Sequence, residues 1–177
     1  MRDALLLVDV IADFRHEDGD ALLASFEARH GCLLEAISEA RRRELPIVYA
    51  NDNEGVWDGD GPGLVRAAIE GKGGRLVEQV APRAGDCFVV KPRYSAFDLT
   101  PLELILESLR IERLQLAGTA LEMCVAQTAI DAREVGYKVT VLADACACID
   151  PRLEAVALEY LEAVTGTVVF RGRGLAR

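Results

Sequence analysis

Three reactive side chains, Asp9, Lys91 and Cys124, each lie at or just beyond the end of a short apolar run. Asp9 follows a Leu-Leu-Leu-Val run, Lys91 follows Phe-Val-Val, and Cys124 stands where a helical pattern begins. Taken singly, each has a commoner structural role, as a hydrogen-bond acceptor, a solvated lysine or a small core hydrophobe. Together, at the ends of three different runs, they predict one reactive site.

The chemistry that this set supports is nucleophilic attack by sulfur. A thiolate is a strong nucleophile, and a helix N-terminus with a nearby ammonium lowers the pKa of a thiol, so we expect Cys124 to be activated. Asp9 can accept the thiol proton and pass it to a leaving group, while Lys91 keeps Asp9 ionised. Backbone N–H groups between Gly118 and Cys124 are candidate oxyanion donors. The set therefore predicts acyl transfer with a carboxylate base in place of histidine.

The elements that must position these residues alternate along the chain. Most of the apolar runs are rich in Val, Ile and Leu without polar alternation, which is typical of strands buried on both faces of a parallel sheet; they lie at residues 4–10, 46–50, 87–90, 113–117, 138–142 and 167–170. Helical patterns separate them, at residues 24–44, 63–69, 101–109, 124–135 and 152–163. This order predicts a three-layer α/β/α sandwich around a mostly parallel, Rossmann-like sheet of about six strands.

One domain over residues 1–177 is expected, because the length suits a single core and the chain contains neither a linker nor a repeat. Residues 51–63 read as a long irregular loop that carries the only tryptophan, Trp57. Asp150 and Pro151 fit the N-cap and first position of the last helix. Gly31 predicts a later start or a break in the first helix.

Composition excludes several classes of function. A formal net charge of −9 disfavours binding to nucleic acid or to anionic membranes, and the apolar N-terminal run is too short to cross a bilayer. We therefore expect a cytoplasmic protein whose five cysteines are thiols. With only His16 and His30 present, a histidine-based metal site is poorly supported. No cofactor is expected.

Three separated motifs resemble the isochorismatase-like cysteine hydrolases, a superfamily that includes nicotinamidases and N-carbamoylsarcosine amidases. The motifs read LLVDVIADF at residues 6–14, KPRYSAF at 91–97 and GTALEMCV at 118–125. The last continues through GYKV at 136–139 and VLADA at 141–145. The similarity covers nearly the whole chain in the same order, which makes it more specific than one motif alone.

The resemblance implies Asp9 as general base, Lys91 as its electrostatic partner and Cys124 as nucleophile. It also implies a cis peptide bond between Thr119 and Ala120, which would direct the Ala120 N–H toward an oxyanion beside the Cys124 N–H. The superfamily also implies a homo-oligomer, a dimer or a tetramer. Whether residues of a neighbouring subunit complete the pocket stays open at this point.

One departure concerns metal. Nicotinamidases bind a metal through an Asp and two His near the loop after the second strand. Asp52 matches the Asp here, but Asn53 and Glu54 occupy the neighbourhood of the histidine, and both histidines of this chain lie upstream. We therefore expect a metal-free member that does not act on nicotinamide. Asn51 to Asn53 are expected to hold the loop by side-chain-to-backbone hydrogen bonds.

Four aromatic residues are candidate walls of a small-molecule pocket, since such surfaces line most ligand sites; they are Phe14, Trp57, Tyr94 and Phe97. Core packing is at least as common a role for each. The four other cysteines are expected to be structural, namely Cys32, Cys87, Cys146 and Cys148.

The leading hypothesis is hydrolysis of a small-molecule amide or carbamoyl C–N bond through a thioester. Two alternatives stay open: vinyl-ether hydrolysis of the isochorismatase kind, and a catalytically silent homologue that binds a small molecule.

Overall fold

The computed structural model describes residues 1–53, 55 and 60–176. Six parallel strands form one sheet in the order β3-β2-β1-β4-β5-β6, which confirms the predicted fold class. The strands are β1 (Asp3–Val8), β2 (Ile47–Asp52), β3 (Cys87–Lys91), β4 (Arg113–Gly118), β5 (Lys138–Cys146) and β6 (Val168–Phe170).

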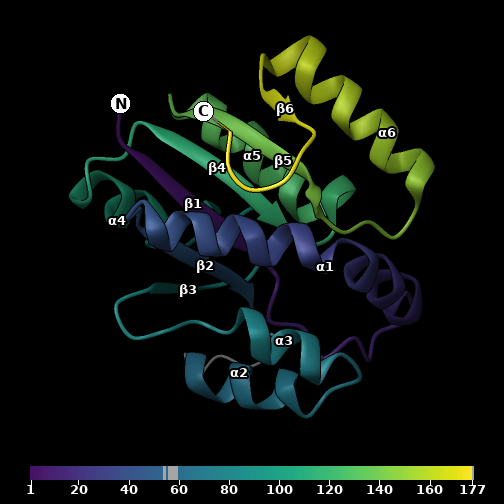
Figure 1. Cartoon of the computed structure of the whole chain (residues 1–177). Coiled ribbons are helices and arrows are strands. Elements are labelled where there is room, and N and C mark those ends of the chain that lie inside the picture. Colours follow the sequence, from purple (N-terminus) through teal and green to yellow (C-terminus); the bar gives the residue numbers. More distant parts are fainter. Residues whose placement is uncertain (54, 56–59, 177) are drawn as a thin grey trace.

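The helices cover both faces of this sheet. They are α1 (Gly19–Arg42), α2 (Gly61–Ile69), α3 (Gly74–Val80), α4 (Leu102–Ser108), α5 (Ala126–Glu134) and α6 (Pro151–Tyr160), with π-helical turns at η1 (Leu121–Val125) and η2 (Leu161–Thr165). Figure 1 shows α1 in front of the sheet and α5 behind it. Within the described residues, none of the helices is long and apolar enough to span a membrane.

The central strand β1 explains why the core forms where it does. All six residues of β1 are buried, as expected for an apolar strand with helices on both faces. Strand order reverses at β1, because β2 and β3 follow on one side while β4, β5 and β6 follow on the other. In open parallel sheets, ligand sites lie beyond the carboxyl ends of the strands at such a reversal.

Strand register brings the predicted reactive residues to this point. Val8 pairs with Ala50 of β2 and with Gly118 of β4, and Asp52 at the end of β2 pairs with Lys91 at the end of β3. The carboxyl ends of β1 to β4 therefore meet at one rim. Asp9 and the turn that holds Cys124 follow directly from it.

The structure corrects one predicted helix and adds another. Helix α1 runs without interruption through Gly31, so the predicted late start or break is wrong; a Cβ at that position would meet only the tip of the Arg173 side chain, at 3.7 Å. Helix α3 was not predicted. Its seven residues form too short an amphipathic pattern to stand out from the sequence.

The start of α6 matches its prediction. The Asp150 side chain accepts a 2.8 Å hydrogen bond from the Arg152 N–H, and Pro151 occupies the first helical position.

Candidate active site

Asp9 is held at the carboxyl end of β1 by its backbone. Its φ of +50° is left-handed, a conformation that Asp adopts more readily than most residues, and its N–H donates to the Ala50 carbonyl at 2.9 Å. The side chain is thereby directed between two partners. Oδ1 accepts a 2.7 Å hydrogen bond from the Asp52 N–H, and Oδ2 lies 2.8 Å from the Lys91 Nζ.

Lys91 ends β3 and is fully buried. Its ammonium donates to the Asp9 carboxylate at 2.8 Å, to the Arg93 carbonyl at 3.0 Å and to the Cys124 Sγ at 3.5 Å. These three acceptors match its three N–H donors, so the buried charge is fully satisfied. Lys91 thus joins the carboxylate and the thiol. We name Asp9, Lys91 and Cys124 the rim cluster.

Cys124 lies in η1 rather than at the start of an α-helix, which begins only at Ala126. Single π-helical turns are frequent at functional sites. The Thr119–Ala120 peptide bond that precedes the turn is cis, as the resemblance implies. The Thr119 hydroxyl donates to the Asp9 carbonyl at 2.8 Å and ties the turn to the end of β1.

Gly118 permits this close approach. Its φ is +142°, and a Cβ at this position would lie 1.9 Å from the Val8 carbonyl oxygen. Any side chain would push β4 away from β1. The glycine therefore sets the distance between Asp9 and the turn that carries Cys124.

The electrostatics of the rim cluster differ from the prediction for the thiol. Burial, followed by the negative charge of Asp9, raises the pKa of Cys124 to about 12, although the Lys91 ammonium acts in the opposite direction. The expectation of a thiol activated by a helix terminus and an ammonium is wrong in the resting structure. At neutral pH Cys124 carries its proton and is hydrogen-bonded to Asp9.

The pKa values of Asp9 and Lys91 are both raised, for different reasons. Burial raises the pKa of Asp9, outweighing the Lys91 ammonium and the hydrogen bonds that the carboxylate accepts. Burial alone would lower the pKa of Lys91, but the attraction of Asp9, together with that of Cys124 and Asp52, outweighs it and the pKa of Lys91 is raised. The Asp9 carboxylate is therefore more basic than that of an exposed aspartate.

A cavity of about 450 Å³ adjoins the rim cluster. Its lining comes from the end of β2, the loop after β3 and the helix that follows Cys124; the residues are Asp52, Pro92, Arg93, Tyr94, Ser95, Asp98, Gln127 and Asp131. Two of them touch the rim cluster directly, because the Asp52 N–H donates to Asp9 and the Arg93 carbonyl accepts from Lys91. We name this space the rim cavity.

The sequence of this chain matches a known enzyme family. The family model for the isochorismatase domain matches residues 3–170. The chain belongs to the isochorismatase family. An uncharacterized isochorismatase family protein of Bacillus subtilis, YaaI, is 32% identical over 161 residues, which cover 91% of this chain and 89% of that protein.

Two relatives with named activities are amidases. The ureidoacrylate amidohydrolase RutB of Cronobacter sakazakii is 29% identical over 174 residues, covering 81% of this chain and 74% of that protein. The solved structure of N-carbamoylsarcosine amidase from Thermoplasma acidophilum is similar at a TM-score of 0.75 with 31% identity, covering 97% of this chain and 96% of that one. Both names agree with the predicted hydrolase acting on non-peptide C–N bonds.

The metal site of some isochorismatase-like enzymes does not fit the described residues of this chain. Among them, no three His, Cys, Asp or Glu side chains lie close enough together to hold a metal ion. His30 instead packs on Phe26 inside the fold, and its Nε2 lies 3.3 Å from the Gln79 Oε1.

Asn51 and Asn53 hold the chain after β2 as predicted. The Asn51 amide donates to the Ile11 carbonyl at 2.8 Å and accepts from the Ile11 N–H at 3.0 Å. The Asn53 Oδ1 accepts a 3.1 Å bond from the Gly55 N–H. These bonds fix the segment whose Asp52 N–H orients Asp9.

The structure places the predicted pocket residues that it describes in different environments. Tyr94 is 60% exposed and lines the rim cavity. Phe14 is corrected to a core residue, because its ring is fully buried and packs against Phe26 at 5.4 Å between centroids. Phe97 is partly buried, packs on Tyr137 at 6.0 Å and is absent from the cavity lining. Trp57 lies outside the described residues.

Sequence reasoning missed Gln127 and Asp131, which line the rim cavity from α5. The available signal was helical spacing, since they follow Cys124 by three and seven residues and so share its face of the helix.

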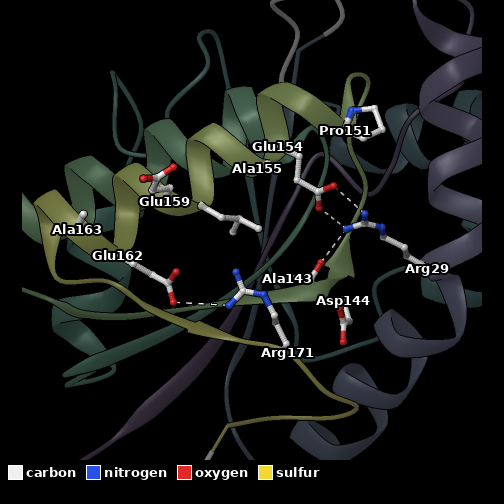
Figure 2. Close-up of a pocket in the computed structure, with 11 residues that line it drawn as sticks. Arg29, Ala143, Asp144, Pro151, Glu154, Ala155, Glu159, Glu162, Ala163 and Arg171 are labelled. Atoms are coloured by element: carbon white, nitrogen blue, oxygen red, sulfur yellow. Dashed lines mark hydrogen bonds and ion pairs between the residues drawn. The ribbon is translucent and has the colours of Figure 1, made fainter.

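A second hollow, of about 660 Å³, lies between α1, the end of β5 and α6 (Figure 2). Strand β6 pairs with β5 only up to Leu142, and Arg29 fills the open edge beyond it. Its guanidinium donates to the Ala143 carbonyl at 3.0 Å, to the Cys146 carbonyl at 2.8 Å and to both oxygens of Glu154. Figure 2 shows Arg29 and Glu154 facing each other across this edge.

Cys148 belongs to the same region, since its Sγ lies 3.3 Å from a Glu154 oxygen and its N–H donates to the Ser25 hydroxyl at 3.0 Å. We name Glu154, Arg29 and Cys148 the edge cluster. All five cysteines are free thiols, as predicted.

Proposed function

We propose that this chain is a cysteine hydrolase that cleaves the C–N bond of a small amide or carbamoyl compound through a thioester on Cys124. One observation carries the proposal. A carboxylate, an ammonium and a thiol meet at the carboxyl ends of the sheet, with the Lys91 Nζ 2.8 Å from Asp9 and 3.5 Å from the Cys124 Sγ. Membership of the isochorismatase family and the amidase relatives support it.

The first half-reaction transfers one proton and forms one bond. As the Cys124 Sγ attacks the carbonyl carbon, Asp9 takes the thiol proton, so sulfur need not be ionised beforehand. The negative charge moves to the carbonyl oxygen, which the Ala120 and Cys124 N–H groups stabilise. When the C–N bond breaks, Asp9 gives the proton to the departing nitrogen, leaving an amine and a thioester.

The second half-reaction restores the enzyme. Asp9 removes a proton from water, and the hydroxide attacks the thioester carbon. The C–S bond then breaks, the acid leaves, and the sulfur recovers its proton from Asp9. Lys91 keeps its charge throughout and stabilises the ionised Asp9 between the steps. The raised pKa of Asp9 suits both proton transfers, because a more basic carboxylate is a better acceptor from a thiol.

The test compares Cys124→Ala with wild type on a panel of small amides and carbamoyl compounds. We expect turnover to fall by about a thousandfold or more, and the acyl adduct seen by mass spectrometry on wild type to vanish. Cys148→Ala is the matched control, because it removes the thiol of the edge cluster, and we expect it to keep its activity. Equal activity of Cys124→Ala and wild type would refute the proposal.

The same panel includes a vinyl ether and therefore covers the alternative activity. Turnover of the ether without an acyl adduct would replace the amidase proposal with isochorismatase-like hydrolysis. Tight binding of panel compounds without any turnover would instead support the silent homologue. Assembly into dimers or tetramers, a single domain and a cytoplasmic location stay predictions from the sequence.

A further inference from the structure

The rim cavity adjoins the residues that hold Asp9 and Lys91 in place. Two of its lining residues, Asp52 and Arg93, bond directly to Asp9 and Lys91, and Gln127 lies one helical turn beyond Cys124. A volume of about 450 Å³ lies within the range typical of small-ligand sites.

The charges around this cavity are unbalanced. Three carboxylates, those of Asp52, Asp98 and Asp131, line it against one guanidinium, that of Arg93. Arg93 already pairs with Asp98 at 3.0 Å, so binding a substrate anion there would compete with an existing ion pair. Asp131 accepts a 3.5 Å hydrogen bond from Gln127 and adds to the negative field.

Two further features favour a positive ligand. Tyr94 lines the cavity and is 60% exposed as a residue, and an aromatic face attracts cations. The chain as a whole carries a formal charge of −9, which attracts cations and repels anions over several ångströms at low salt. Ureidoacrylate, which names one relative, is a carboxylate and would meet repulsion from both sources.

We propose that the rim cavity selects amide or carbamoyl substrates whose unreactive end is a cation or a neutral hydrogen-bond donor, and rejects those ending in a carboxylate. Asp131 and Tyr94 are the residues that set this preference. The inference rests on the proposed function and names its substrate class.

The experiment uses three compounds with the same amide and chain length that end in an ammonium, a carboxamide or a carboxylate. For wild type at low salt, we expect kcat/KM for the ammonium compound to exceed that for the carboxylate by about a hundredfold, with the carboxamide between them. Asp131→Asn should reduce this ratio about tenfold, and added salt should also reduce it.

Glu134→Gln is the matched control, because it removes one negative charge from the exposed end of α5 outside the cavity lining. We expect it to leave the ratio unchanged. A wild-type preference for the carboxylate would overturn the inference, and so would an equal effect of Asp131→Asn and Glu134→Gln.

Calorimetry with Cys124→Ala separates this inference from the proposed function, because binding needs no turnover. Tighter binding of the ammonium compound than of the carboxylate supports the selection even if wild type hydrolyses none of the three. In that case the proposed hydrolysis fails and the charge selection stands. Preference for the carboxylate, or no binding of any compound at millimolar concentration, overturns the selection.

Discussion

Two regions of this molecule each bring a carboxylate, a cation and a thiol into contact. The rim cluster joins a carboxylate, an ammonium and a thiol, and the edge cluster joins a carboxylate, a guanidinium and a thiol. In both, the ion pair is largely withdrawn from water and the sulfur lies within 3.5 Å of a charged partner. A search by residue type alone would rank them equally.

The surroundings of the two clusters separate their roles. Cys148 is buried, and Arg29 spends its donors on two strand carbonyls and both Glu154 oxygens, which closes the open edge of β5. Cys124 is partly exposed in a π-helical turn, and two residues that bond to Asp9 and Lys91 of its cluster, Asp52 and Arg93, line the rim cavity. A thiol beside an ion pair is therefore a candidate nucleophile only where a substrate can reach it.

The strongest test of the difference between the two clusters replaces the cation in each of them. Lys91→Met should reduce kcat/KM by about 100- to 1,000-fold, because Asp9 loses the charge that keeps it ionised. Arg29→Met should leave kcat/KM within a few-fold of wild type, yet lower the free energy of unfolding by about 3 kcal/mol, because Glu154 and two carbonyls lose their partner.

Steady-state kinetics at a temperature where both variants are folded, with urea unfolding monitored by circular dichroism, measure the two effects. Loss of activity in folded Arg29→Met as large as in Lys91→Met would mean that the two clusters do not differ in role.

A second test concerns the protonation of the reactive thiol. The alkylation rate of Cys124 by iodoacetamide should keep rising above pH 9.0, the ordinary thiol value, because burial and the Asp9 charge raise its pKa to about 12. In Asp9→Asn the rise should shift to lower pH, since the neighbouring negative charge is gone, while hydrolysis is lost. Peptide mapping by mass spectrometry separates Cys124 from the other cysteines.

An unshifted labelling profile in Asp9→Asn would show that the carboxylate does not act on the thiol. Cys148 provides the internal comparison, because its profile should not respond to a change at Asp9.

The smallest expected effect is the position of the acidic limb of activity. Asp9 must be ionised to accept the thiol proton, and burial raises its pKa above the ordinary value of 3.8. Activity should therefore fall, as pH is lowered, at a midpoint above 3.8. By contrast Asp3, whose pKa is lowered because hydrogen bonds from Arg113 and Gln115 outweigh its burial, should ionise below 3.8.

The kcat/KM profile against pH gives the first midpoint, and carboxyl carbon chemical shifts in NMR give both. A limb at or below 3.8 in a protein that stays folded would contradict the basic carboxylate at the rim.

Much of the fold could be predicted from the sequence, because parallel strands that are buried on both faces consist of unbroken apolar runs. All six strands lie where those runs are, and α6 begins at the predicted Asp150 cap. Helix α3 escaped because seven residues give too little periodicity. Phe14 was wrongly predicted as a pocket wall, because the sequence near a site does not show whether an aromatic ring points into the core or toward a ligand.

The sequence by itself determined the order of the elements and the arrival of Asp9, Lys91 and Cys124 at strand ends, since each depends on local pattern. Only the tertiary structure decided the state of the thiol and the charge of its cavity. A pKa depends on the water and charges that distant segments remove or supply, and the rim cavity draws on the end of β2, the loop after β3 and α5. No single stretch of sequence therefore shows the combined effect of these segments on the thiol and on the cavity.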